Sequence, residues 1–442
     1  MEKLIESLDD HTLLTLLTIS KIKDDSTIKS LCKSLPTFTP STQSLKDRLT
    51  TLNSKVSSFV DTLKSKVTSS SSSITTSSPS QKKITIYVEG VFDIIHSGHF
   101  NAIRQAKKLG DILCVGVNSD ADVARAKGPT LMPCNERAEL AKACKWADSV
   151  VPDTPYTPSV KLLDDLKVDF CAHGDDIPYN ENGECVYDEI MKANRMKWFK
   201  RTEGVSTTEI IGRLLMCICD DKEKMNSTAL TKEEKENLKQ LEEFSKNRKP
   251  VMSSFLATSW RISEFSNAKV PKEGDKIIYI DGDFDILHIG HIQALKAAKS
   301  LGNFVYVGVH DDDTVRKHKG KNFPILNLNE RVFNLLALKY VDEVIIGAPY
   351  KITEDMVKSL KIDVVVEGIK KGGISIYDDA YEIPKKMGIY KSIELEYDLS
   401  NQMLIDRIYN NRDIYIKKFL NKAKKDQEYL ENKTGKDEVK EI

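Results

Sequence analysis

Two histidines three residues apart, His96 and His99, are the residues of this 442-residue chain best suited to chemistry by type and spacing. They lie within Ile84–Leu109, where a β-branched apolar run predicts a strand, Gly90 a turn, and the later spacing of apolar residues a helix. A helix N-terminus has unpaired N–H groups and a positive potential, and both attract phosphate. Imidazoles beside it can donate hydrogen bonds to phosphate oxygens that gain charge during transfer. The pattern therefore indicates phosphate binding and transfer.

A single His-x-x-His motif is a weak signal, because a surface turn or half of a metal site has the same spacing. Here the whole stretch recurs. Ile277–Leu301 repeats the strand, glycine and helix pattern, with His288 and His291 placed 192 residues (288 − 96) after the first pair. The offset becomes 194 (329 − 135) after a short insertion. A chance motif does not recur together with its flanks, so the sequence predicts a duplicated unit.

Two further stretches carry cations that suit a phosphate. Arg201–Thr208 precedes a helical run and ends in good N-cap residues beside an arginine, whose fork matches phosphate oxygens. An isolated stretch of this kind would more often be only a helix cap. Lys127 is followed by Gly and Pro, and we expect a flexible segment there that could close over a nucleotide. A lone lysine is usually solvated, but this one recurs as Lys319.

A third candidate is His173-Gly174-Asp175-Asp176, which follows a buried apolar strand pattern. An Asx turn and a satisfied histidine at a strand end would explain these residues without a function. The functional interpretation is a cage for an ammonium group or for Mg²⁺.

Strand and helix patterns alternate through residues 84–220, which predicts a doubly wound parallel sheet with right-handed crossovers. Ligands on such sheets bind at the carboxyl ends of the strands, where Gly90, His96, Asn118 and His173 all fall. The predicted elements after the first helix are strands at Ile112–Val117, Ser149–Val151 and Val168–Ala172 and helices at Asn135–Trp146, Ser159–Leu166, Met191 onward and Thr208–Cys217.

The fold class expected is α/β, with two tandem Rossmann-like domains that have doubly wound parallel sheets, and a low-complexity N-terminal extension. The predicted segments are an extension with a Ser/Thr-rich linker (1–83), a first domain (84–220), a Lys/Glu-rich connector (221–275), a second domain (276–412) and a charged tail (413–442). Within the connector, Ser254–Ser266 is more apolar, and we expect it to pack on one of the domains.

Composition narrows the class of protein. With 40% apolar and 30% charged residues and a net charge of zero, nothing indicates a nucleic-acid partner. The eight cysteines form no Cys-x-x-Cys pair, which favours reduced thiols in a cytoplasmic protein and makes a protein metal site improbable. No stretch reaches the roughly 20 apolar residues of a membrane span, so at most peripheral membrane contact is expected, through the extension.

The motifs GVFDIIHSGH and RTEGVSTT resemble the cytidylyltransferase family, within the HxGH nucleotidyltransferase superfamily. Two tandem copies joined by FLATSWRISEFS resemble the branch of that family that acts on phosphoethanolamine. The resemblance covers roughly residues 84–412. It implies transfer of CMP from CTP to phosphoethanolamine, with release of pyrophosphate and with Mg²⁺ accompanying CTP. Attack by the phosphate of the substrate itself would need no covalent intermediate.

The resemblance also implies roles for residues of the first copy. His96 and His99 would contact the CTP phosphates and stabilise the transition state, and Lys127 and Arg201 would neutralise phosphate charge. The residues expected to line the nucleotide site are Gly90, Val91, Phe92, Thr202, Ser206 and Thr207, and those expected to bind the second substrate are Asp93, His173, Asp175 and Asp176.

The second copy departs from this pattern. At the matching positions Arg201 is replaced by Leu395 and His173 by Glu367. An apolar side chain cannot replace a guanidinium against a triphosphate. We therefore expect the second half to bind a cytidine nucleotide without turning it over by itself, through Asp283, Phe284, His288, His291, Lys319, Ser400 and Asn401.

Other functions remain open at this point. Phosphocholine is the nearest alternative substrate, and a nucleotide-sensing regulator without catalysis is the alternative of another class. A class I aminoacyl-tRNA synthetase shares a similar histidine motif, but the chain has no tRNA-binding charge and we reject it. A homodimer is possible.

Overall fold

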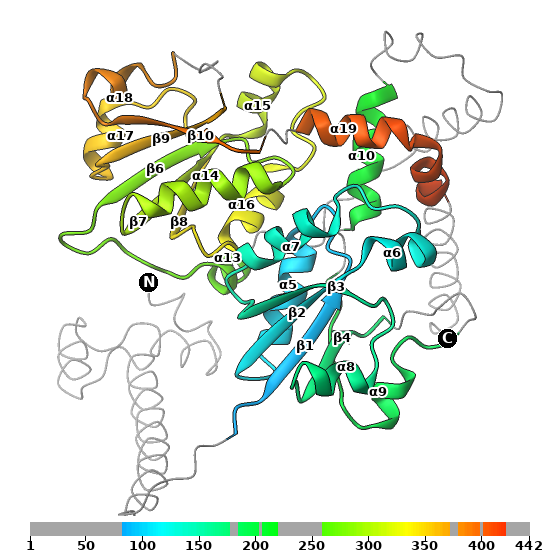
Figure 1. Ribbon diagram of the computed structural model, residues 1–442. Helices are drawn as coiled ribbons and strands as arrows, with labels where there is room; N and C mark the ends of the chain where they lie inside the picture. Colours follow the sequence, from blue (N-terminus) through cyan, green and yellow to red (C-terminus); the bar gives the residue numbers. More distant parts are fainter. Residues whose placement is uncertain are drawn as a thin grey trace, which may run out of the picture. The chain divides into compact units, whose positions relative to one another are not determined.

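The computed structural model describes residues 82–176, 184–202, 206–219, 259–371, 379–397 and 401–420 (Figure 1). All of them belong to one compact unit, Lys82–Ile442. The predicted N-terminal extension lies outside the described residues except for its last two, and so do most of the Lys/Glu-rich connector and the last part of the tail.

The first half is a five-stranded parallel sheet in the order β3-β2-β1-β4-β5. The chain leaves β1 on one side of the sheet and later returns to β4 on the other, so this is the predicted doubly wound α/β fold. Its elements are β1 (Thr85–Gly90), α5 (Ser97–Lys107), β2 (Ile112–Asn118), α6 (Asp120–Lys127), α7 (Cys134–Ala143), β3 (Ser149–Thr154), α8 (Val160–Asp165), β4 (Phe170–Gly174), α9 (Asp188–Lys192), β5 (Met196–Phe199) and α10 (Thr207–Cys219).

The second half repeats this topology, with strands in the order β8-β7-β6-β9-β10, all parallel. The predicted duplication is therefore confirmed. After α13 (Ser259–Phe265) come β6 (Ile277–Gly282), α14 (Ile289–Ser300), β7 (Phe304–Val309), α15 (Asp312–Lys319), α16 (Leu328–Leu336), β8 (Glu343–Ile346), α17 (Glu354–Ser359), β9 (Val364–Lys370), α18 (Glu382–Lys386), β10 (Tyr390–Leu395), α19 (Asn401–Asn410) and a last helix at 412–420.

One local prediction was wrong, and the structure refines two others. The chain is not helical from Met191 onward, because α9 ends at Lys192 and Met196–Phe199 pairs with β4 as an edge strand. Lys127, expected in a flexible segment, is the last residue of α6, whose start Ser119 caps by accepting a hydrogen bond from the Asp122 N–H (3.2 Å). The first residues of the predicted charged tail belong to a helix at 412–420.

The two halves share one apolar core. Phe265 of α13 packs edge-on against Trp146 of the first half (5.2 Å between ring centroids) and against Phe333 of the second (5.1 Å). In the same segment Glu264 forms an ion pair with Arg104 at 2.8 Å. The described part of Ser254–Ser266 therefore packs on both domains, where the sequence predicted packing on one.

The halves are related by a local two-fold pseudosymmetry. Cys144 and Leu338, which are 194 residues apart (338 − 144), form an antiparallel bridge across the junction. The two hydrogen bonds beside it, Lys145 N–H to Ala337 O and Lys339 N–H to Ala143 O, are both 2.9 Å long. Beyond them α10 of the first half and α19 of the second lie side by side (Figure 1).

An arginine on each of these two helices reaches across to the other half. Arg213 donates to Ile325 O (3.1 Å) and Glu330 (2.8 Å). Its counterpart Arg407 donates to Leu131 O (3.0 Å) and Glu136 (2.8 Å). Arg407 therefore fastens the second half to the segment after α6, and Arg213 fastens the first half to the segment after α15. Both segments lie close to the predicted sites.

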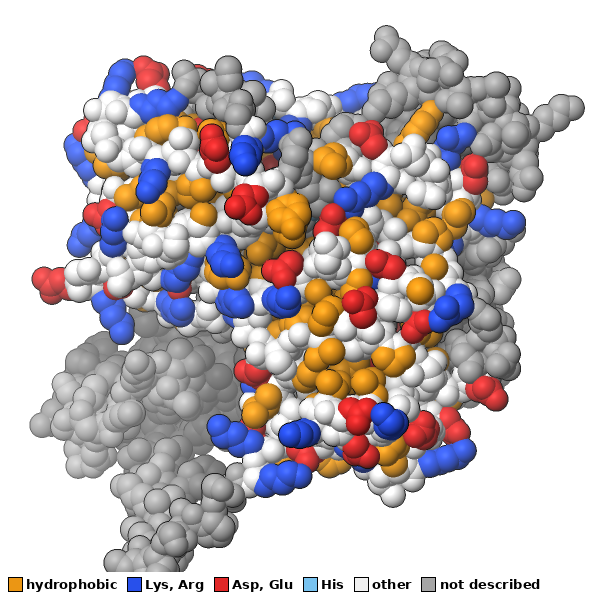
Figure 2. Space-filling view, in the orientation of Figure 1, with side chains coloured by type: hydrophobic (Ala, Val, Ile, Leu, Met, Phe, Trp, Pro, Cys, Tyr) orange, Lys and Arg blue, Asp and Glu red, His pale blue; other side chains and the backbone are white. Residues whose placement is uncertain are grey.

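On the described face seen in Figure 2, Lys and Arg side chains are interspersed with Asp and Glu side chains over both halves. Every helix in the described ranges is too short or too polar to cross a lipid bilayer.

Candidate active site

A cavity of about 430 Å³ opens at the carboxyl ends of β1, β4 and β5 in the first half. Pockets that take nucleotide-sized ligands fall in this range of volume. Its lining includes all the predicted first-half site residues except Asp175: Gly90, Val91, Phe92, Asp93, His96, His99, Lys127, His173, Asp176, Arg201, Thr202, Ser206 and Thr207. The topology therefore brings residues more than 100 positions apart into one site.

The turn between β1 and α5 is held in an unusual backbone conformation. Phe92 and Ile94 both have left-handed φ angles, 51° and 45°. A Cβ added to Gly90 would lie 3.0 Å from the Phe92 ring. Such conformations cost free energy and are found where a site requires them. The glycine thus lets the Phe92 ring fold back toward the strand end and line the pocket.

His96 and His99 stack at the start of α5, with ring centroids 3.9 Å apart and planes at 29°. His96 Nδ1 accepts the Gly98 N–H at 3.1 Å, so a neutral His96 ring carries its proton on Nε2. Burial, reinforced by Lys127 and Arg201, lowers the pKa of His99 to about 3. His99 is therefore neutral at physiological pH and can donate a hydrogen bond without adding a charge.

Two cations border the histidines. Lys127 ends α6, and its Nζ lies 5.2 Å from the centre of the Tyr156 ring. Arg201 is half exposed and pairs with Asp176 through Nη1 at 2.5 Å. The Asp175 carboxylate accepts the Arg201 backbone N–H at 2.9 Å. In this structure Asp175 and Asp176 therefore hold Arg201, where the sequence suggested a cage for an ammonium group or for Mg²⁺.

The residues around the start of α10 hold this edge of the pocket in place. Ser206 Oγ accepts the Glu209 N–H at 3.2 Å and so caps the helix. Thr207 donates its hydroxyl to the Asp93 carbonyl (3.1 Å), and Thr202 accepts from the Asn101 side chain (2.8 Å). The capping interpretation of this stretch is thus correct, and it leaves the same residues facing the cavity.

The carboxylate of Asp93 is committed to the backbone. Its two oxygens accept the N–H groups of Leu131 (2.8 Å) and Met132 (2.9 Å), and the side chain is buried. Burial raises its pKa, although the two backbone hydrogen bonds oppose that shift. Asp285 makes the same pair of contacts in the second half. Asp93 therefore positions the loop after α6 rather than binding a substrate ammonium.

Sequence reasoning missed Arg137, which is fully buried on α7. It donates to the carbonyls of Met132 (2.9 Å) and Asn118 (2.8 Å) and to that of Val91 in the turn after β1. A buried guanidinium is held there only because so many acceptors surround it. The repeat of Asn-Glu-Arg at 135–137 and 329–331 was the signal that could have identified it.

Sequence reasoning also missed Glu89, which is among the residues that line the cavity. It is buried and accepts hydrogen bonds from Tyr87 (3.3 Å), Tyr187 (3.4 Å) and Asn118 (3.5 Å). Burial raises its pKa to about 8. The Tyr187 ring also lies 4.9 Å from His173 and 6.3 Å from Trp198. A buried carboxyl beside aromatic rings is a suitable site for an ammonium group.

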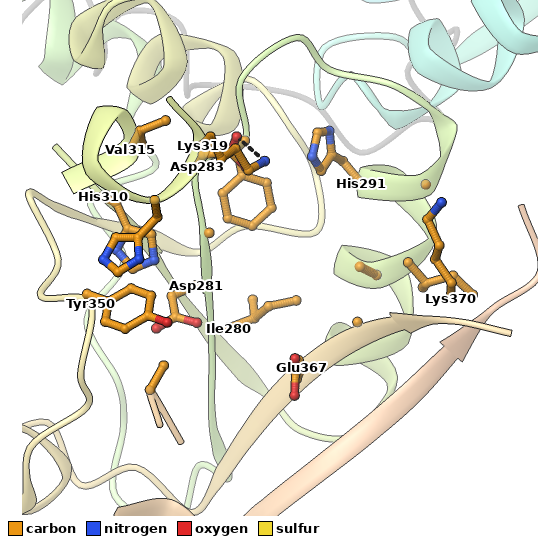
Figure 3. A pocket seen from close by; sticks show the side chains of 18 of the residues that line it. Ile280, Asp281, Asp283, His291, His310, Val315, Lys319, Tyr350, Glu367 and Lys370 are labelled. Carbon is orange, nitrogen blue, oxygen red and sulfur yellow. Dashed lines mark hydrogen bonds and ion pairs between the residues drawn. The ribbon is translucent and has the colours of Figure 1, made fainter. Parts of the chain in front are cut away.

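A second cavity, of about 270 Å³, occupies the matching place in the second half. His288 and His291 stack there at 3.8 Å, and Phe284 has the same left-handed backbone (φ 44°). The difference lies in the charges. Figure 3 shows Lys319 joined to Asp283, a 2.6 Å ion pair with no equivalent in the first half, where position 91 is valine.

Other charges of the second cavity also differ. Glu367 takes the place of His173 and accepts a 2.6 Å hydrogen bond from Tyr390. Leu395 takes the place of Arg201, as the sequence showed, but Lys370 lines the cavity where the first half has Asp176. Sequence reasoning missed Lys370. Ser400 lies outside the described residues, and so does the side chain of Asn401, the first residue of α19.

Comparison with known proteins agrees with this geometry. A family model described as cytidylyltransferase-like matches residues 87–213 and 279–426, once in each half. The chain is 44% identical over 357 residues to the ethanolamine-phosphate cytidylyltransferase of Dictyostelium discoideum, covering 79% of this chain and 98% of that protein. It is 39% identical over 365 residues to the enzyme of the same name from Arabidopsis thaliana, covering 80% of this chain and 87% of that protein. The chain belongs to the ethanolamine-phosphate cytidylyltransferase family.

The ethanolamine and choline enzymes differ in how much of this chain they match. Choline-phosphate cytidylyltransferase 2 of Arabidopsis thaliana is 40% identical over 144 residues, which cover 31% of this chain and 47% of that protein. The likeness to the choline enzyme thus extends over only part of the chain. The tandem arrangement of both halves is shared with the ethanolamine family.

From the sequence, Mg²⁺ was expected to accompany CTP, and no metal site built from protein side chains was expected. No group of three or more His, Cys, Asp or Glu side chains in the described part of the chain is arranged to hold a metal ion. The nearby carboxylates are already engaged, Asp93 with two amides and Asp176 with Arg201.

Proposed function

We propose that the first pocket transfers CMP from CTP to phosphoethanolamine, giving CDP-ethanolamine and pyrophosphate. A phosphate oxygen of phosphoethanolamine forms a bond to the α-phosphorus of CTP. The bond from that phosphorus to the oxygen bridging to the β-phosphate breaks, and its electron pair leaves on pyrophosphate. The protein needs no covalent intermediate, so its contribution is positioning and charge stabilisation.

The observation that carries this proposal is the stacked histidine pair at the N-terminus of α5, bordered by Lys127 and Arg201 in one cavity. The His96 Nε2–H and the neutral His99 can donate to oxygens that gain negative charge as the α-phosphorus reacts. Lys127 and Arg201 neutralise the charge of the phosphates and of the leaving pyrophosphate. The start of α5 adds backbone N–H groups and a favourable dipole.

The ammonium end of phosphoethanolamine fits against Glu89. This carboxyl lies in the same cavity as the histidines, is buried, and is surrounded by the hydroxyls of Tyr87 and Tyr187. A bound ammonium would compensate the burial of the carboxylate, which otherwise favours its protonated form. Because Asp93, Asp175 and Asp176 are engaged elsewhere, Glu89 is the carboxyl we assign to this role.

For the second pocket we propose nucleotide binding without independent turnover. Its stacked histidines and left-handed Phe284 preserve the phosphate-facing turn, while Asp283 neutralises Lys319 and leucine replaces the arginine. A regulatory nucleotide site would have this arrangement, so we assign the nucleotide-sensing role to the second half.

We also propose a cytoplasmic location, because the described cysteines Cys114, Cys134, Cys144, Cys171 and Cys185 are free thiols, as a reducing compartment maintains. The homodimer left open by the sequence stays a prediction. Sedimentation of the purified chain would test it by giving the mass of the particle in solution.

Pyrophosphate release tests the reaction directly. The purified full chain is incubated with CTP and Mg²⁺ and, in separate reactions, phosphoethanolamine, phosphocholine or glycerol 3-phosphate. We expect strong turnover with phosphoethanolamine alone. Turnover with phosphocholine would preserve the mechanism and change the substrate, whereas no turnover with any acceptor would favour a purely regulatory protein.

A further inference from the structure

The first pocket is not built from the first half alone. Tyr415 and Lys418, from the last described helix of the second half, are among the residues that line it. The described lining of the second pocket, in contrast, comes only from the second half. The second half therefore contributes side chains to the first pocket, whereas the first half contributes none to the described lining of the second pocket.

Helix α19 and the last helix both contact the segment that follows Lys127. Arg407 of α19 holds both oxygens of Glu136 (2.8 and 2.9 Å) and the Leu131 carbonyl (3.0 Å). Tyr415 donates its hydroxyl to the Pro129 carbonyl at 3.3 Å. Residues 129–131, between Lys127 and α7, are thus gripped at both ends by the second half.

Packing against the first half fixes the helix from its other side. Tyr415, Ile416 and Phe419 are buried in the shared core. A Cβ added to Gly212 of α10 would lie only 2.3 Å from the Phe419 ring. This close approach determines the rotation of the last helix about its axis, and with it the direction of Lys418.

Lys418 lies directly beside the loop at Gly128. A Cβ added to that glycine would be 3.1 Å from Lys418 Cε and 3.2 Å from its Nζ. The side chain is partly buried, and its ammonium interacts electrostatically with Asp93 and repels Lys127. Within the described ranges it has no hydrogen bond or ion pair, and its ammonium lies 5.7 Å from the centre of the Tyr415 ring.

A partly buried ammonium next to a second lysine is unfavourable unless an anion is bound between them. Both oxygens of Asp93 already accept backbone N–H groups, so this carboxylate is not free to move between the two lysines. The triphosphate of a nucleotide bound at His96 and His99 carries the charge that the two lysines would share.

We propose that Lys418, donated by the second half, binds the phosphates of CTP in the first pocket, so that the two halves form one complete active site. This inference rests on the proposed function of the first pocket. It also gives the second half a role in catalysis that does not depend on ligand binding in its own cavity.

Matched lysine variants test the proposal in the full chain. Lys418→Gln keeps most of the length of the side chain and removes its charge. Lys418→Arg keeps the charge. Lys417→Gln changes the exposed neighbour on the same helix and is the control. CTP affinity is measured by calorimetry with Mg²⁺ and without the second substrate, and thermal unfolding is recorded for each variant.

We expect Lys418→Gln to weaken CTP binding at least about ten-fold, as the loss of one charge-assisted contact would. Lys418→Arg should restore most of the affinity, and Lys417→Gln should match the unaltered chain. The KM for phosphoethanolamine should change less than about two-fold. Equal CTP affinity in the Lys418→Gln and Lys417→Gln variants would overturn the proposal. A chain that binds CTP yet fails to use phosphoethanolamine would refute the proposed reaction while leaving this titration decisive for Lys418.

Discussion

The two cavities share a scaffold and differ in their charges. Each has a parallel sheet of the same order, a left-handed phenylalanine after the first strand and a stacked histidine pair at a helix start. In the first, Lys127 makes no ion pair within the described part of the chain and Arg201 is held by a half-exposed aspartate. In the second, Lys319 is paired with Asp283 and leucine replaces the arginine.

This comparison separates binding geometry from catalytic charge. Both halves keep the turn, the glycine and the stacked rings, which we propose shape a phosphate-binding pocket. Turnover needs in addition cations that are available to the reacting phosphates, and only the first half keeps the arginine.

The largest effect is expected from the paired variants His96→Ala and His288→Ala. His96→Ala removes a donor that faces developing charge, and losses of about 100-fold or more in kcat are typical of such donors. His288→Ala should reduce kcat less than about five-fold. Steady-state rates with CTP and phosphoethanolamine distinguish the two. Comparable losses in both variants would show that the second pocket takes part in turnover.

Arg201→Leu gives the first pocket the residue that the second already has. We expect kcat/KM for CTP to fall about 30-fold, because a charge-assisted contact to phosphate is lost. Lys200→Leu, at a neighbouring exposed position, is the control. If Arg201→Leu leaves activity unchanged, the missing arginine does not explain why we expect no turnover in the second half.

Glu89→Gln tests whether the Glu89 carboxylate binds the ammonium group of phosphoethanolamine. Because the pKa of Glu89 is raised to about 8, the carboxyl is mainly protonated below that pH and ionised above it. An ammonium prefers the ionised form, so the KM for phosphoethanolamine should fall as pH rises from 7 to 9. The variant should raise that KM about ten-fold at pH 9 and abolish its pH dependence. A pH dependence unchanged by Glu89→Gln would exclude this role.

The smallest effect is expected from Asp283→Val, which gives the second pocket the residue of the first. Removing the partner of Lys319 should strengthen nucleotide binding in the second half about three-fold, since a partly exposed ion pair contributes little. Binding is measured by calorimetry in an Arg201→Leu background, where we expect weaker binding of CTP in the first pocket. Weaker binding in this variant would indicate that Asp283 itself contacts the nucleotide.

Much of the fold and of the site could be predicted from sequence because the signals are local. The alternation of strands and helices predicted both sheets, and His96, His99, Lys127 and Arg201 stood in motifs with distinct flanks. Glu89 escaped notice because a residue at the end of a strand gives no sign of whether it is buried. Asp93 was misread, since only the folded loop shows which amides its carboxylate accepts.

Lys418 could not have been predicted in the same way. It lies in a charged stretch that looked like a frayed tail, far along the chain from the site it joins. Its position depends on the pairing of α10 with α19 and on the clamp at Arg407, which are contacts between the two halves. Long-range packing of this kind leaves no periodic pattern in the sequence near either partner.

The clamp on residues 129–131 has a consequence for how the molecule is made. The ribosome delivers the first half early, and N-terminal domains generally fold before the rest of the chain emerges. The hydrogen bonds from Arg407 to the Leu131 carbonyl and to Glu136, however, can form only after position 407 has been synthesised. The hydrogen bond from Tyr415 to the Pro129 carbonyl forms later still. A nascent chain or a prematurely terminated product would thus hold every histidine of the first pocket with its loop still unsecured.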